Sequence, residues 1–198
     1  PEPLPKNLQS TFEAVKSSQV DLGIVVDPDV DRLAFIDEHG EFMGEEYTLV
    51  AVADYIMRKK SGPAVSNLSS SIALQDICEK HGVDYHSSAV GEVNVVEKMK
   101  EVNAVIGGEG NGGVILPDLH YGRDALAGTA LFLNFMAETD KKASAIRAQY
   151  RTYFMVKDKM GIEGVDLPGL LKFIAEKHQH RRQDDIDGLK IYFDQGWV

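Results

Sequence analysis

The sequence predicts an α/β protein in which mixed sheets are flanked by helices. Segments of strand length alternate with segments of helical periodicity along most of the 198 residues, which is typical of this class. Hydrophobic residues make up 43% of the chain, which is enough for a substantial core and too many for a disordered protein. We expect one complete α/β domain with parts of a neighbouring domain on either side of it.

The first 62 residues contain elements of a domain but too few strands for an independent sheet. The expected elements are a helix carrying Leu8, Phe12 and Val15, strands at residues 21–26 and 33–36, a turn at His39-Gly40, and a helix at residues 45–60 that ends before Gly62-Pro63. Two short strands alone are marginally stable in water. We therefore interpret residues 1–62 as the carboxyl-terminal part of a domain.

Residues 63–151 show the regular alternation of a complete small α/β domain. The expected elements are strands near Val65 and at residues 83–85 and 104–106, with helices at residues 72–81, 92–101 and 124–138. Ser69-Ser70-Ser71 is predicted to form a loop or to cap the helix that follows it.

Residues 152–198 are interpreted as a linker and the start of a truncated domain. Strands are expected at residues 153–156 and 188–193, and a helix at residues 167–177. A strand of buried type and Trp197 stand at the last residues of the chain. From this pattern we expect both ends of the sequence to be cuts in a longer chain.

Composition restricts the classes of partner and the compartment. With 21 Lys and Arg against 31 Asp and Glu, the net charge is −10, which argues against a surface for nucleic acid or anionic membranes. The single cysteine, Cys78, excludes an intrachain disulfide and a zinc cluster built on cysteines. Because no apolar run reaches the length of a membrane span and no signal peptide is visible, we expect a cytoplasmic protein.

The run Asp27-Pro28-Asp29-Val30-Asp31-Arg32 is the first candidate site, and it follows a predicted strand. Ligand sites of α/β proteins gather at the carboxyl ends of strands. Three carboxylates at alternate positions offer the hard oxygen donors that Mg²⁺ and Ca²⁺ prefer. Without a cation they repel one another, so the run predicts a divalent metal site.

Three other interpretations of this run were weighed. In an EF-hand loop, Asp27, Asp29 and Asp31 would be ligands, but Arg32 stands where that loop requires glycine. An aspartyl-phosphate enzyme would use Asp27 as nucleophile and Asp29 as acid, which leaves Asp31 and Arg32 without a role. The third interpretation is a solvated acidic turn, and the flanking strands disfavour it.

The second candidate site is the glycine-rich segment at residues 107–113. Gly108, Gly110 and Gly113 match the spacing of a dinucleotide fingerprint, but an extended segment follows them instead of the helix that such a site needs. What remains is a loop that presents one acid, Glu109, and one amide, Asn111. This pair suits hydrogen bonding to the neighbouring hydroxyls of a sugar, with a plain turn as the alternative.

The two loops, in this order and about eighty residues apart, together resemble those of the α-D-phosphohexomutase family, which comprises phosphoglucomutases, phosphomannomutases and phosphoglucosamine mutases. Residues 1–32 resemble the end of the family's second domain with its metal loop. Residues 63–151 resemble the third domain, which carries a sugar-recognition loop matched by residues 108–112. Residues 187–197 resemble the opening of the fourth domain.

The resemblance implies a Mg²⁺-dependent isomerase that interconverts hexose 1-phosphate and hexose 6-phosphate. In this family a phosphoserine of the first domain phosphorylates the sugar, and the bisphosphorylated sugar returns its other phosphate to the serine. The roles that this implies here are metal binding by Asp27, Asp29 and Asp31, phosphoryl stabilisation by Arg32, and substrate binding by Glu109, Gly110, Asn111 and Arg123. Arg32 could instead form a salt bridge with the neighbouring acids.

The chain departs from the family pattern in several places. The segments expected to carry the serine and the phosphate-binding loop of the fourth domain are missing, so we expect a fragment that is inactive alone. Its partners would be a hexose phosphate and those missing domains. Many relatives have histidine where this chain has Gly113 and lysine where it has Ala89. Arg123 or His120 could compensate, and Asp124 could cap the following helix.

Two further functions remain open from the sequence alone. One is a non-catalytic module that binds a sugar phosphate or a metal, and the other is a calcium-binding domain.

Overall fold

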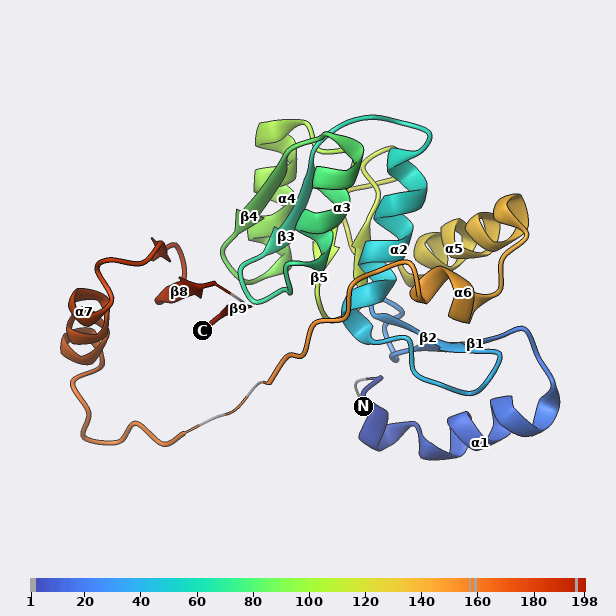
Figure 1. Cartoon of the computed structure of the whole chain (residues 1–198), viewed down its shortest axis with the longest axis horizontal. Coiled ribbons are helices and arrows are strands. Elements are labelled where there is room, and N and C mark those ends of the chain that lie inside the picture. Colours follow the sequence, from blue (N-terminus) through green and yellow to red (C-terminus); the bar gives the residue numbers. More distant parts are fainter. Residues whose placement is uncertain (1–2, 157, 159, 195) are drawn as a thin grey trace. The chain divides into compact units, whose positions relative to one another are not determined.

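A computed structural model describes residues 3–156, 158, 160–194 and 196–198. The chain divides into two compact units, with the division between Tyr153 and Phe154. Helices and mixed sheets alternate along the chain (Figure 1), which confirms the predicted α/β class. None of the helices formed by the described residues combines the length and the apolar character that a membrane-spanning segment needs.

The amino-terminal part of the first unit contains a pair of antiparallel strands on either side of the acidic loop. The elements here are η1 (Pro5–Asn7), α1 (Gln9–Ser18), β1 (Leu22–Val26) and β2 (Leu33–Asp37). Val26 pairs with Leu33, so residues 27–32 connect the two strands. All five residues of β2 are buried, which explains why its sequence is a continuous apolar run ending in one carboxylate.

A four-stranded sheet forms the centre of the first unit. Its strands are β3 (Ala64–Asn67), β4 (Tyr85–Ser88), β5 (Ile106–Glu109) and β6 (Gly113–Ile115). The order is β4-β3-β5-β6, with β3 parallel to β4 and β5, and β6 antiparallel to β5.

Two strand predictions for this sheet were wrong in their boundaries. The strands expected at residues 83–85 and 104–106 begin at Tyr85 and Ile106, and β5 continues through two glycines to Glu109. Glycine is unfavourable in strands, so the sequence suggested a loop here. At Gly107, a Cβ atom would lie 2.4 Å from the Met99 sulfur. The glycine therefore lets a helix pack close to the strand.

Helices cover both faces of the four-stranded sheet. They are α2 (Glu45–Met57), α3 (Ala73–His81), α4 (Glu92–Val102) and α5 (Ala125–Thr139), while α6 (Ala143–Arg147) packs against α2 and β2. Ala64 and Val114 pack in the core formed with α2 and α3, whereas the next residues, Val65 and Ile115, pack with α4. Adjacent strand residues point to opposite faces, so α4 lies on the face opposite α2 and α3.

Helix α5 joins the β1–β2 pair to the sheet. The ring of Phe132 on α5 stacks on Phe35 of β2 with their centroids 4.2 Å apart. Both residues belong to the same buried cluster as the sheet residues Ile106 and Val114. The acidic loop and the glycine-rich segment are therefore held by one continuous core.

A buried carboxylate links α2, α3 and the segment after α6. The Asp54 side chain has no exposed surface. It accepts hydrogen bonds from Arg58 at 3.0 Å and Tyr150 at 3.1 Å, and it lies 2.6 Å from His81 Nε2 and 3.3 Å from Lys80 Nζ. Burial opposes ionisation, but His81, Arg58 and Lys80 outweigh it and hold the pKa of Asp54 below its usual value.

The strand predicted at residues 153–156 is absent from the structure. Residues 151–156 have no regular secondary structure, and Phe154 and Val156 are 94% and 91% exposed. The backbone N–H of Tyr153 donates to the Tyr47 hydroxyl rather than to another strand. The apolar composition of the segment suggested a strand, but a strand needs a neighbour to pair with.

The described residues of the second unit form one helix and three short strands. They are α7 (Leu167–Lys177), β7 (Gln183–Asp184), β8 (Lys190–Phe193) and β9 (Gly196–Trp197). The helix has the predicted bounds, and the Asp166 side chain caps it by accepting from the Gly169 N–H. Strand β8 lies within the predicted range 188–193 and pairs antiparallel with both β7 and β9.

Candidate functional site

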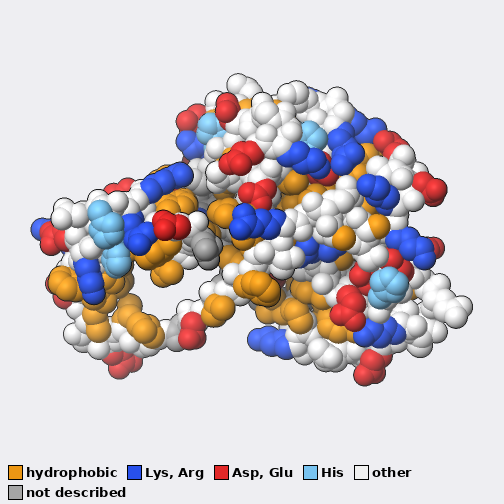
Figure 2. Space-filling view, in the orientation of Figure 1, with side chains coloured by type: hydrophobic (Ala, Val, Ile, Leu, Met, Phe, Trp, Pro, Cys, Tyr) orange, Lys and Arg blue, Asp and Glu red, His pale blue; other side chains and the backbone are white. Residues whose placement is uncertain are grey.

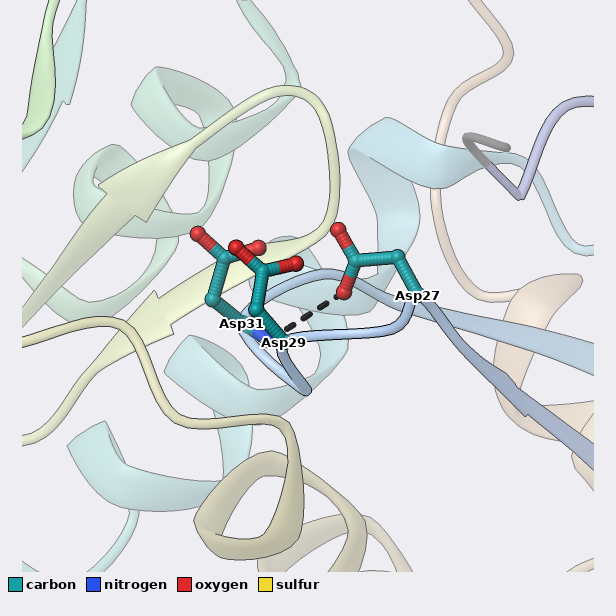
Figure 3. Close-up of side chains that lie close together, drawn as sticks. All are labelled: Asp27, Asp29 and Asp31. Carbon is teal, nitrogen blue, oxygen red and sulfur yellow. Dashed lines mark hydrogen bonds between the residues drawn. The ribbon is translucent and has the colours of Figure 1, made fainter.

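The three aspartates of the acidic loop converge on one point. Asp27, Asp29 and Asp31 each offer a carboxylate oxygen, and these oxygens lie within 4.8 Å of one another. Figure 3 shows their carboxylates gathered on the same side of the loop. Asp27 is buried, Asp31 is partly buried and Asp29 is exposed, so the convergence point is open to solvent on one side.

The loop keeps this shape through its own backbone. Asp27 Oδ1 accepts the N–H groups of Asp31 at 3.2 Å and Arg32 at 3.0 Å. Val30 takes a left-handed conformation with φ of 59°, which is rare for a β-branched residue, and its carbonyl accepts the N–H of Ala125. The loop is thus closed upon itself and tied to the start of α5.

The carboxylates of the loop differ in their tendency to ionise. Burial opposes ionisation of Asp27, but hydrogen bonds from the backbone of Arg32 and Asp31 keep its pKa below the usual value. Burial raises the pKa of Asp31; Arg123 opposes this rise, and the carboxylates of Asp27 and Asp29 add to it. Asp27 thus ionises more readily than an isolated aspartate, and Asp31 less readily.

The donor set of the loop fits a hard divalent cation. Asp31 Oδ2 forms an ion pair with Arg123, whereas Asp31 Oδ1 is buried with no hydrogen-bond partner among the described residues. A buried carboxylate oxygen that accepts no hydrogen bond is costly, and the Arg32 Nε atom at 3.9 Å is too distant to donate one. A cation bound by the three aspartates would remove that cost, and carboxylate oxygens are the ligands that Mg²⁺ and Ca²⁺ prefer.

Arg32 lies against the acids of its own loop. Its Nε atom is 3.7 Å from Asp27 Oδ2 and 3.9 Å from Asp31 Oδ1. This is the salt-bridge arrangement that the sequence left open. Contact with a phosphoryl group remains a prediction for this residue.

The glycine-rich segment is a β-hairpin turn between β5 and β6, not a free loop. The chain continues from Gly113 as strand β6, so the dinucleotide fingerprint is excluded because no helix follows the glycines. Glu109 ends β5 and is buried. Its Oε1 atom accepts from Asn67 Nδ2 at 2.8 Å, and its Oε2 atom accepts from Asn111 Nδ2 at 3.4 Å.

The polar groups of the turn also hold the turn together. Asn111 Oδ1 accepts the N–H of Gly113, and the N–H of Gly110 donates to Ser70 Oγ at 3.0 Å. Ser70 Oγ donates in turn to Asn67 Oδ1. Ser69 belongs to the same network, and Ser71 Oγ accepts the Ala73 N–H at the start of α3, in agreement with the loop-or-cap prediction for these serines.

Arg123 brings the two candidate sites together. Its guanidinium pairs with Asp31 of the acidic loop, with Glu109 of the turn at 2.5 Å, and with Glu92 at 3.4 Å. The sequence suggested Arg123 as a possible sugar contact but gave no sign of Glu92 or Asn67. Both were missed because their contacts depend on the crossing of distant elements.

The other two candidates near Arg123 are less closely involved. His120 is half exposed, and its Nε2 atom lies 3.0 Å from Asp124 Oδ2. The other oxygen of Asp124 accepts the Ala127 N–H and caps α5, as its position in the sequence suggested.

Replacing Gly112 with alanine is expected to destabilise the hairpin turn by about 2–5 kcal/mol. Gly112 has φ of 90°, and an added Cβ would lie 2.2 Å from the carbonyl oxygen of Leu33. Gly82→Ala is the matched control because Gly82 has φ of 66° with open space around it. Urea denaturation should show a larger loss for Gly112→Ala, and equal losses would mean that the close approach to β2 is unimportant.

Comparison with family models assigns most of the chain. Residues 44–153 match "Phosphoglucomutase/phosphomannomutase, alpha/beta/alpha domain III". Residues 1–40 match "Phosphoglucomutase/phosphomannomutase, alpha/beta/alpha domain II".

Relatives carry related names. The chain is 37% identical to a phosphoglucomutase/phosphomannomutase of Thermococcus kodakarensis and 30% identical to a probable phosphoglucosamine mutase of Methanopyrus kandleri. Each alignment covers 100% of this chain and 44% of the relative. The chain therefore spans less than half of the length of these relatives.

Solved structures show the same fold. A phosphoglucomutase/phosphomannomutase family protein from Burkholderia thailandensis matches with a TM-score of 0.83 at 22% identity, over 98% of this chain and 42% of that protein. A putative phosphomannomutase from Thermus thermophilus matches with a TM-score of 0.78 at 24% identity, over 100% and 44% of the two chains. Since one family model alone covers more than half of the sequence, this chain belongs to the phosphoglucomutase/phosphomannomutase family, the α-D-phosphohexomutases.

Proposed function

We propose that this chain supplies the metal-binding and sugar-binding parts of a phosphohexomutase that interconverts hexose 1-phosphate and hexose 6-phosphate. The observation that carries the proposal is the meeting of the two loops. The aspartates of residues 27–31 converge, and Arg123 places Glu109 of the hairpin turn next to them. A phosphoryl group and the sugar that carries it could therefore be held side by side.

The proposed domain assignment follows the family order. Residues 1–62 would be the end of the domain that carries the metal loop, residues 63–151 the sugar-binding domain, and residues 152–198 a linker and the start of the next domain. The relatives are more than twice as long as the matched region. We assign the phosphoserine and the remaining phosphate-binding groups to other parts of the longer protein.

The residues of the two loops would divide the chemistry. Asp27, Asp29 and Asp31 would hold Mg²⁺, which when bound neutralises negative charge on phosphoryl oxygens during transfer. Arg32, beside these acids, would add a fixed positive charge close to the phosphoryl group. The turn would bind the sugar through the carboxylate of Glu109 and the amide of Asn111, whose hydrogen-bonding groups match vicinal hydroxyls.

The net negative charge of the two loops means that phosphate binding would need additional positive groups. Among the described residues, the carboxylates of Asp27, Asp31, Glu92 and Glu109 form ion pairs with two guanidinium groups, those of Arg32 and Arg123, and the carboxylate of Asp29 lies in the same cluster. A phosphate dianion would be repelled by this excess of negative charge. Phosphate recognition thus calls for the cation and for basic residues from the rest of the protein.

The surface and the cysteine support this assignment in a cytoplasmic metabolic enzyme. On the face that Figure 2 shows, Lys and Arg side chains are interspersed with Asp and Glu rather than gathered into a continuous basic surface. Burial raises the pKa of Cys78 to about 12, so its thiol is unreactive.

An activity assay tests the proposal. The isolated chain is incubated with Mg²⁺, a hexose bisphosphate activator and, in turn, glucose 1-phosphate, mannose 1-phosphate and a glucosamine phosphate. We expect no turnover above background, because the phosphoserine is assigned to another segment, and we expect the longer protein to convert at least one of these substrates. Robust turnover by the isolated chain would contradict the assignment of the serine. Inactivity of the longer protein towards all three would contradict the proposed reaction.

A further inference from the structure

Arg123 occupies an unusual position between three acids from separate elements. Its Nη2 atom pairs with Asp31 Oδ2 of the acidic loop, Nη1 lies 2.5 Å from Glu109 Oε2 at the end of β5, and Nε lies 3.4 Å from Glu92 Oε2 on α4. The Arg123 backbone N–H also donates to Glu92 Oε1 at 2.9 Å. Glu92 therefore holds the main chain of Arg123 by a hydrogen bond and lies beside its side chain as an ion-pair partner.

The hairpin turn makes room for this side chain. A Cβ atom at Gly113 would lie 2.3 Å from Cδ and 3.1 Å from Cγ of Arg123. The aliphatic part of the Arg123 side chain thus occupies the space that a side chain at position 113 would need. Only 14% of the Arg123 side chain is exposed, so its guanidinium has little freedom to leave the three acids.

The ion pairs of Arg123 determine which carboxylate oxygens of the two loops are available to bind a cation or a sugar. Asp31 Oδ2 forms an ion pair with Arg123, while Asp31 Oδ1 has no hydrogen-bond partner among the described residues. On the other side, Glu109 is held between Arg123 and Asn67. A guanidinium is planar and presents its N–H groups in fixed directions, so the positions of Asp31 and Glu109 depend on each other.

We propose that Arg123 is a positioning residue that couples cation binding at the acidic loop to the order of the hairpin turn at residues 109–113. The inference rests on the proposed function, because it requires the aspartates to bind a cation. A cation that fixes Asp31 also fixes the end of Arg123 that pairs with it, and through Arg123 it fixes Glu109. The sugar-binding turn would then be ordered before the sugar arrives, which reduces the entropic cost of sugar binding.

Hydrogen exchange followed by mass spectrometry tests this coupling with Mg²⁺ alone as the probe. The turn contains suitable reporters, because the N–H groups of Gly110, Gly112 and Gly113 all donate hydrogen bonds. In the unmodified chain, saturating Mg²⁺ should slow exchange at residues 27–32 and also at residues 109–113, the latter by about fivefold. In Arg123→Met, which keeps an aliphatic stem over Gly113 but removes the charge, Mg²⁺ should slow exchange only at residues 27–32.

A matched control separates coupling from general loss of stability. Arg147 likewise donates hydrogen bonds to several partners, Met43, Tyr150 and Thr152, but these partners lie outside both loops. Arg147→Met should therefore lower stability while leaving the effect of Mg²⁺ on the turn intact. If Arg123→Met does not fold, Gly113→Ala displaces the arginine stem without removing charge, and Gly161→Ala, with open space around it, is its control.

The outcomes distinguish the inference from the proposed function. Equal slowing of the turn by Mg²⁺ in the unmodified chain and in Arg123→Met would overturn the role of Arg123. Slowing at residues 27–32 without any at residues 109–113 in the unmodified chain would also overturn it, while leaving the metal site in place. No slowing at residues 27–32 would overturn the metal site and the inference together.

Discussion

Replacing Asp54 with alanine is expected to lower the free energy of unfolding by about 3–5 kcal/mol. The Asp54 carboxylate is fully buried and is contacted by Arg58, Lys80, His81 and Tyr150. Its removal leaves these groups without their common partner and removes the polar link between α2 and α3. Urea denaturation followed by circular dichroism measures the loss.

The control for this substitution is an aspartate in an exposed ion pair. Asp118 pairs with Lys60 at 2.7 Å, but its side chain is 62% exposed. Exposed ion pairs contribute little to stability, so Asp118→Ala should lower the free energy of unfolding by less than about 1 kcal/mol. A similar cost for both variants would show that the Asp54 cluster does not hold the helices together.

The contribution of Asp54 should also depend on pH. Because its pKa in the folded protein is below the usual value, folding favours the ionised form, and the resulting stability is present above the unfolded-state pKa of about 3.9. That stability is lost as the pH falls through the lower, folded-state pKa. The difference in unfolding free energy between the unmodified chain and Asp54→Asn should therefore shrink as the pH falls below about 5. A difference that does not change as the pH falls would contradict a stabilising role for the ionised Asp54 carboxylate.

Replacing Asp29 with asparagine is expected to weaken Mg²⁺ binding on the order of a hundredfold, or about 2.7 kcal/mol. A unit charge pair 4 Å apart near a protein surface is worth about 4 kcal/mol, so losing one carboxylate from the cluster has a large effect. Asp29 is the exposed member of the cluster, so the fold should tolerate the change. Calorimetric titration with Mg²⁺ gives the affinities of both chains.

A matched control shows whether the loss of affinity comes from the cluster itself. Asp21→Asn removes the same charge just before β1, outside the cluster, and should leave Mg²⁺ affinity within about twofold. Asp27→Asn is a poorer choice because Asp27 also accepts the backbone N–H groups of Asp31 and Arg32, so it would change the loop as well as the charge. If Asp29→Asn and Asp21→Asn bind Mg²⁺ equally, the cluster is not the binding site.

Much of the fold follows from local patterns. The apolar runs that became β1 and β2, the helical periodicity of α2 and the bounds of α7 could all be read from the sequence. The errors occurred where tertiary contacts outweigh local preference. Gly107 gives Met99 of α4 room to pack on strand β5, and Gly108 lies against the backbone of Gly113 and the side chain of Leu49. Residues 153–156 pair with no strand among the described residues.

The candidate site was predictable in its parts but not in its assembly. The alternating acids at residues 27–31 and the glycine-rich segment are local signals, and each was found. The contacts of Arg123 with Asp31, Glu92 and Glu109 join residues from different elements. Sequence spacing cannot show such contacts, because they depend on how β5, α4 and the acidic loop cross in space.

The central claim is that the aspartates of residues 27–31 bind a hard divalent cation. The most direct test is the anomalous scattering of Mn²⁺ in crystals of this chain grown with that ion, which takes the same oxygen ligands as Mg²⁺. The account predicts a peak about 2.0–2.3 Å from one carboxylate oxygen of each of Asp27, Asp29 and Asp31. Ordered side chains at these positions with Mn²⁺ bound only elsewhere would contradict it.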